Sequence, residues 1–133
     1  ADKRVKVYCF GNPLVKEDSL PLEIIPELKK KFPNIDFIPA ESPDDIEDEN
    51  EINIIDMVDG IENVSLITDI DAICDNRRCS MHDFDLGMTL KIMKKMGRIR
   101  KINIFAIPIH CKKREAIREI EKLLSEALTP LDS

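Results

Sequence analysis

The chain has 133 residues, a length typical of one globular domain. Hydrophobic residues make up 43% and charged residues 35%, a composition that excludes a disordered chain. The net charge of −6 opposes contact with phosphate backbones, so we expect no nucleic-acid partner.

The first half of the chain predicts two strands and an interrupted helix. Residues 5–10 are β-rich and end at the turn signal Gly11-Asn12-Pro13, which indicates a first strand. Ser19 is a candidate helix cap, and Pro26 should kink the helix that follows because it lacks a backbone N–H. Residues 35–39 predict a short strand, and the acidic residues 41–51 predict an exposed loop or a frayed helix. The apolar residues at helical spacing are Leu22, Ile25, Leu28 and Phe32.

The second half predicts three strands and two helices. Residues 52–55 form an apolar run that ends at Asp56, which indicates a strand covered on both faces. Residues 64–70 and 101–108 predict two further strands. Ser80 and Asp83 fit a capping box, which places His82 in the first turn of a helix that ends at Gly97. The expected buried residues of this helix and of a closing helix at 112–128 are Leu86, Leu90, Met93, Ala116, Ile120, Leu123, Ala127 and Leu128.

This alternation of strands and helices predicts the fold class. Right-handed crossovers between parallel strands give a three-layer α/β/α domain, with a mostly parallel sheet of about five strands and helices on both faces. We expect one domain over residues 1–133. Ligands of such folds bind at the carboxyl ends of the strands.

The cysteines and the apolar runs indicate a cytoplasmic protein. Cys9 fits the core, and the spacing of Cys74 from Cys79 is not that of a zinc or redox motif. We therefore expect thiols rather than disulfides, Cys111 included. The longest apolar run, residues 102–109, is far shorter than the roughly 20 residues of a membrane span, and the first residues lack a signal-peptide pattern.

Three polar residues are expected at the same edge of the sheet. Asp18 follows the first strand, Asp56 ends a central strand, and His82 begins a helix. Two carboxylates and an imidazole suit a divalent ion such as nickel or zinc, and they leave positions open for water or substrate. Each residue also has a structural interpretation, as a helix cap, a strand-end turn residue or a helix-start residue.

Three short motifs resemble those of the hydrogenase maturation endopeptidases. The segment from Phe10 to Asp18 resembles their opening strand, Gly-Asn turn and acidic pair. Ile54-Ile55-Asp56 is similar to their buried strand ending in aspartate, and Ser80-Met81-His82 to their Ser-x-His turn. The resemblance covers nearly the whole chain. It departs at Ser19-Leu20-Pro21, where the family often has a glycine, so Glu17 stays open beside Asp18 as the first metal contact.

The resemblance implies a function and a set of site residues. The family removes a C-terminal extension from the precursor of a nickel hydrogenase large subunit after nickel insertion. Asp18, Asp56 and His82 would contact the nickel of the precursor, so the metal comes with the substrate and the enzyme needs no cofactor of its own. The metal would polarise the scissile carbonyl or activate a water, with a carboxylate as general base. We expect a monomer.

Two other functions remain open at this point. A peptidyl-tRNA hydrolase also begins with a strand and a Gly-Asn-Pro turn, but the aromatic and histidine positions expected after the turn are absent and the acidic charge opposes tRNA binding. A non-enzymatic nickel chaperone would use the same three residues. Tight metal binding by the isolated protein would favour the chaperone over the protease.

Overall fold

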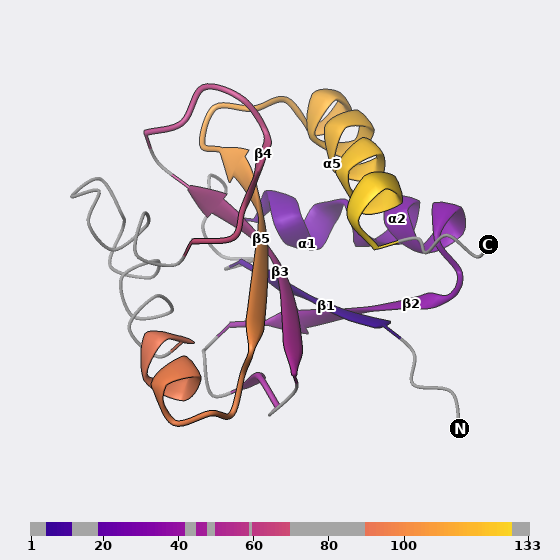
Figure 1. The fold of residues 1–133 in the computed structure, drawn as a ribbon. Coiled ribbons are helices and arrows are strands. Elements are labelled where there is room, and N and C mark those ends of the chain that lie inside the picture. The colour runs from indigo at the N-terminus through magenta and orange to yellow at the C-terminus, as the bar shows by residue number, and fades with distance from the viewer. Residues whose placement is uncertain are drawn as a thin grey trace.

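The computed structural model describes residues 5–11, 19–41, 45–47, 50–58, 60–69 and 90–128, in which a sheet has helices on both faces (Figure 1). The helices are α1 (Leu20–Glu23), α2 (Ile25–Lys31) and α5 (Lys113–Ala127), with a short helical segment at residues 90–95. None of the helices in these ranges is long and apolar enough to cross a membrane. The strands are β1 (Val5–Phe10), β2 (Ile35–Ala40), β3 (Glu51–Val58), β4 (Ser65–Ile67) and β5 (Lys101–Pro108).

The strands are ordered β2-β1-β3-β5-β4. The pairs β1–β2, β1–β3 and β3–β5 are parallel, whereas β4 runs antiparallel to β5. The predicted three-layer fold with a mostly parallel sheet is therefore confirmed. The reversed direction of β4 has a simple cause. A parallel crossover needs about a dozen residues or more, and only residues 59–64 separate β3 from β4.

One face of the sheet is covered by α1, α2 and α5. Odd-numbered residues of the central strands point to this side, among them Cys9, Ile55 and Phe105. They pack against Ile24, Leu28, Ala116, Ile120 and Leu124 of the helices, all of which are fully buried. Side chains alternate between the faces of a strand, so the even-numbered residues point to the opposite side.

The opposite face is covered by the 90–95 segment. Ile54 and Ile104 of the sheet belong to the same buried cluster as Leu90 and Met93. The buried positions expected at Leu90 and Met93 are thus confirmed, and Leu86 lies outside the described residues. Gly97, two residues after the segment, has a φ of 77°, the left-handed conformation typical of a helix C-terminus.

The first helix is divided as its proline predicts. α1 ends at Glu23 and α2 begins at Ile25, with Pro26 in the first turn of α2, where no N–H is needed. Ser19 is the N-cap residue of α1, but its hydroxyl does not cap the backbone. The Ser19 hydroxyl instead donates a hydrogen bond to Glu23 Oε2, one turn along the helix, at 2.6 Å.

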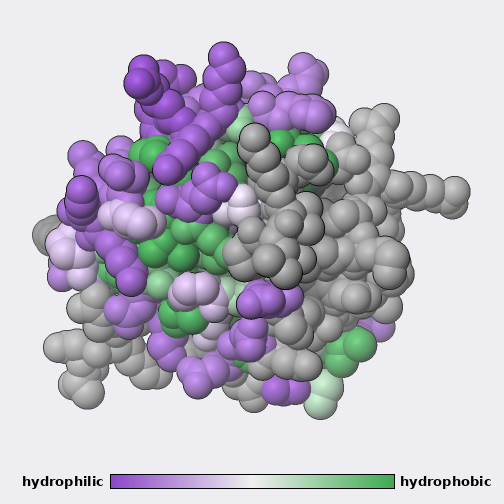
Figure 2. All heavy atoms as spheres, turned by 180° about the vertical axis from the view of Figure 1, so that it is seen from behind, coloured by the Kyte–Doolittle hydropathy of each residue, from purple (hydrophilic) through white to green (hydrophobic). Residues whose placement is uncertain are grey.

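The closing helix departs in part from its predicted stripe. The buried residues of α5 are Ala116, Ile120 and Leu124. Leu123 is only half-buried and Ala127 is exposed. Leu123 and Leu128 nevertheless pack against the core, so the predicted stripe is wrong only at Ala127. Leu124 joins the stripe because it continues the spacing of four residues that points to the sheet. In the view from behind, hydrophilic residues surround a hydrophobic area that borders the grey region (Figure 2).

A buried polar ladder joins three strands near their amino ends. Asn103 Nδ2 donates to Asn53 Oδ1 at 2.8 Å and to Glu51 Oε2 at 2.6 Å. Asn53 Nδ2 in turn donates to the carbonyl of Lys6 at 3.2 Å. These bonds link β5 to β3 and β3 to β1. A shift by one residue would break them, so they help to fix the register of the central strands.

Candidate active site

The carboxyl ends of β1 and β3 lie where the strand order reverses. β2 is on one side of β1 and β3 is on the other. The last paired residues of β1 and β3 are Cys9 and Ile55. Beyond them, the Gly11 N–H donates to the Ala40 carbonyl of β2 at 3.3 Å, so β1 stays with β2 and parts from β3. In open α/β sheets, such a parting is where ligands bind.

Asp56 is the first β3 residue beyond this paired stretch. Its side chain is only 2% exposed, and Oδ1 accepts a hydrogen bond of 2.8 Å from the backbone N–H of Met57. By strand alternation it points to the same side as Ile54 and Val58. A buried carboxylate is costly unless it is hydrogen-bonded, paired or bound to a metal. Asp56 therefore provides an acidic group at the position where this fold class binds ligands.

The position of Asp56 differs in one respect from the prediction. β3 does not end at Asp56 but continues to Val58, and Asp56 pairs with Ala106 of β5. The strand continues because β5 supplies a partner for two further residues, Met57 and Val58. Asp56 is thus at the end of the β1–β3 pairing rather than at the end of its own strand.

The two other predicted site residues lie outside the described residues. Asp18 belongs to residues 12–18, between β1 and the N-cap residue Ser19 of α1. His82 belongs to residues 70–89, which precede the 90–95 segment. Glu17, the other candidate for the first metal contact, is outside them as well. The convergence of Asp18, Asp56 and His82 therefore stays a prediction. Among the described residues, no three His, Cys, Asp or Glu side chains are placed to hold a metal ion.

A cleft of 250 Å³ adjoins this edge of the sheet. It lies between the turn after β3, the turn after β5 and the first turn of α5, and its polar side chains are Glu62, His110, Cys111 and Glu115. Pro108, which also lines it, pairs with Val58, two residues beyond Asp56. Asp56 is not among the residues that line it, so the cleft is a separate recess at the same edge of the sheet. His110 has no role in the sequence-based prediction, although its place directly after a buried strand is a signal for the carboxyl edge.

The two described thiols are poorly suited to act as nucleophiles. Burial raises the pKa of Cys9 to about 12, and the nearby Lys29 lowers it only in part. Burial also raises the pKa of Cys111, and the negative charges of Glu115 and Glu119 raise it further. The thiolate is the reactive form of cysteine, so a raised pKa disfavours nucleophilic attack. The expectation that Cys9 is a core residue is confirmed by its complete burial.

Solved structures of hydrogenase maturation proteases share this fold. The hydrogenase maturating endopeptidase HybD from E. coli is 15% identical, with a TM-score of 0.68 over 95% of this chain and 94% of that chain. An endopeptidase from Escherichia coli is 12% identical, with a TM-score of 0.65 over 94% and 95% of the two chains. A hydrogenase 2 maturation peptidase from a Thaumarchaeota archaeon is 20% identical, with a TM-score of 0.56 over 95% and 98%. No protein-family model and no curated protein sequence matches the chain.

Proposed function

We propose that this protein is an endopeptidase that removes the C-terminal extension from the precursor of a nickel hydrogenase large subunit. The observation that carries the proposal is the buried Asp56 where β1 parts from β3, in a fold shared with maturation endopeptidases along 95% of the chain. A catalytic acid is expected at this position because the carboxyl edge is where the fold class binds its ligands.

The nickel ion belongs to the substrate in this proposal. Asp18, Asp56 and His82 contact it while the precursor's own ligands still hold it. Carboxylate and imidazole groups suit nickel, and three protein ligands leave positions open on the ion. Cleavage then depends on a loaded precursor, since an empty precursor offers these residues nothing to bind.

Hydrolysis requires an activated water and a polarised carbonyl. The substrate's metal supplies the polarisation, and a carboxylate of the site takes the proton of the attacking water. Asp56 suits the second role because its Oδ1 is already oriented by the Met57 N–H at 2.8 Å. Attack by a described thiol is disfavoured, since the pKa values of Cys9 and Cys111 are both raised. The cleft beside Pro108 offers room for the chain next to the scissile bond.

The test is cleavage of purified precursor, loaded with nickel or free of it, followed by intact-mass spectrometry. The wild-type protein should shorten the loaded precursor only. Asp56→Asn should lower the cleavage by a factor of about 10² to 10⁴. A matched control is Asp36→Asn, which changes another carboxylate of the sheet near the amino end of β2.

Two results would contradict the proposal. Equal cleavage of the nickel-free precursor would show that the metal is not recognised. Absence of cleavage, combined with tight nickel binding by the isolated protein in a calorimeter, would favour a nickel chaperone.

A further inference from the structure

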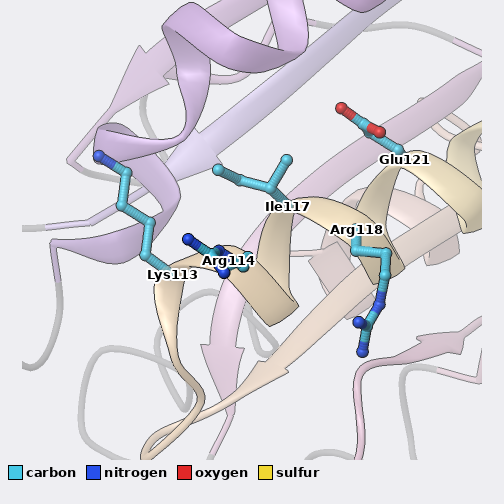
Figure 3. Close-up of a pocket in the computed structure, with 5 residues that line it drawn as sticks. All are labelled: Lys113, Arg114, Ile117, Arg118 and Glu121. Atoms are coloured by element: carbon cyan, nitrogen blue, oxygen red, sulfur yellow. The ribbon is translucent and has the colours of Figure 1, made fainter.

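A groove of 460 Å³ runs along the first half of α5. Figure 3 shows its residues, with Ile117 between the side chains of Lys113 and Glu121 and with Arg114 beside them. Ile117 also packs against the buried core beneath the helix, so its position is fixed. The groove therefore combines an apolar floor with a cluster of cations. Its lining residues are Lys113, Arg114, Ile117, Arg118 and Glu121.

The cations of the groove are not explained by the stability of the helix. Lys112 is the N-cap residue of α5, and Lys113 and Arg114 follow it in the first turn. Positive charge at a helix N-terminus opposes the helix dipole and is normally avoided. Among the described residues, neither Lys113 nor Arg114 forms an ion pair. Three consecutive cations at an unfavourable place, in a chain of net charge −6, indicate a binding role.

The groove begins at the same edge of the sheet as the candidate site. β3 and β5 are parallel, and Pro108 at the end of β5 pairs with Val58 of β3. Only residues 109–112 separate β5 from α5, so the N-terminus of α5 lies at the carboxyl edge. The N-terminal end of the groove is therefore at the same edge of the sheet as Asp56, but the Asp56 side chain points to the other face of the sheet, so a bound polypeptide must pass over this edge to reach it.

We propose that the α5 groove binds an acidic segment of the protein substrate, at a distance from the bond that is cut. The proposal rests on the proposed function. The occupant follows from charge: Lys113 and Arg114 offer two cations that form no ion pair among the described residues, against the single acid Glu121. Arg118, the third cation of the lining, is paired with Glu119 at 3.4 Å. An apolar side chain of the segment packs on Ile117. Nucleic acid is a poorer occupant, because two unpaired cations in an acidic protein compensate few phosphates.

The first experiment measures binding without cleavage. The probe is a short fluorescein-labelled peptide of glutamates and leucines, followed by fluorescence anisotropy, with a lysine-for-glutamate counterpart as control. The wild-type protein should bind the acidic peptide, and salt should weaken the binding. The double variant Lys113→Glu/Arg114→Glu should raise the Kd about tenfold or more. Its folding should be retained, because acids at a helix N-terminus favour the dipole.

The matched control reverses two cations on the other face of the sheet. Lys94→Glu/Lys95→Glu makes the same change in net charge at two exposed residues of the 90–95 segment. It should bind the acidic peptide as the wild type does. Unchanged binding by the α5 variant, equal loss in the control, or tighter binding of a labelled single-stranded oligonucleotide at the same salt would overturn the proposal.

The second experiment separates this proposal from the proposed function. With nickel-loaded precursor, the α5 variant should raise KM and leave kcat unchanged, whereas Asp56→Asn should lose kcat. An α5 variant with wild-type KM would overturn the proposal for the groove and leave the proposed function standing. If the wild type does not cleave the precursor, the proposed function fails, and peptide binding still decides whether the groove takes an acidic segment.

Discussion

Replacing Asp56 by asparagine and by alanine separates its chemical role from its structural one. Both substitutions remove the acid, so both should lower cleavage of nickel-loaded precursor by a factor of about 10² to 10⁴. They differ in the hydrogen bond that Met57 N–H donates to Oδ1 at 2.8 Å. Asparagine keeps an oxygen there, whereas alanine leaves a buried donor unsatisfied, at a cost of about 1–3 kcal/mol.

This cost can be converted into a difference in melting temperature between the two variants. For 133 residues, the entropy of unfolding is about 0.3 kcal/mol per kelvin. Asp56→Ala should therefore melt about 4–10 °C below Asp56→Asn in differential scanning calorimetry. Both variants remove the buried negative charge, so the free energy gained by its removal is the same in each and cancels in this comparison. Wild-type cleavage by Asp56→Asn would refute the catalytic assignment, and equal melting temperatures would refute the structural role of the hydrogen bond.

Three further predictions concern the histidine and the thiols. His82→Ala should abolish cleavage while changing the free energy of unfolding by no more than about 0.5 kcal/mol, and normal cleavage would remove His82 from the site. Serine at Cys74, Cys79 and Cys111 together should leave cleavage intact; loss of cleavage in a folded triple variant would show that a thiol is required. The pKa of Cys9 is raised from 9.0 to about 12, so its contribution to stability is complete below pH 9 and is lost as pH rises toward 12. In urea titrations between pH 9 and 12, the free energy of unfolding of Cys9→Ala should therefore fall less steeply than that of the wild type, by up to about 1.4 kcal/mol per pH unit. Identical slopes in the two proteins would contradict the burial of the thiol.

The fold was largely predictable because its elements follow from local chemistry. β1 and β5 have their predicted bounds, since β-rich, mostly apolar runs between turn signals leave little choice of register or length. The division of the helix near Pro26 was equally local, because a missing N–H acts within one turn. The stripe of α5 was less predictable, because Leu124 and Ala127 are distinguished only by the direction of the sheet.

The candidate site depends on contacts between segments that are far apart in the chain. The sequence identified Asp56 as an acid after an apolar strand, and the structure confirms its burial. Its environment depends on β1 leaving β3 after Cys9, a pairing between segments far apart in the chain. The other two predicted residues, Asp18 and His82, lie outside the described residues, so their roles remain predictions.

The sequence by itself determined the order of strands and helices, the acidic balance and the residue types available for chemistry, because these depend on composition and on contacts within a few residues. The tertiary structure decided which of them meet. It placed β4 antiparallel beside β5, extended β3 past Asp56, linked Asn53 to Asn103, and packed Ile117 of α5 against the core. Such relations arise from long-range packing, which local patterns do not encode.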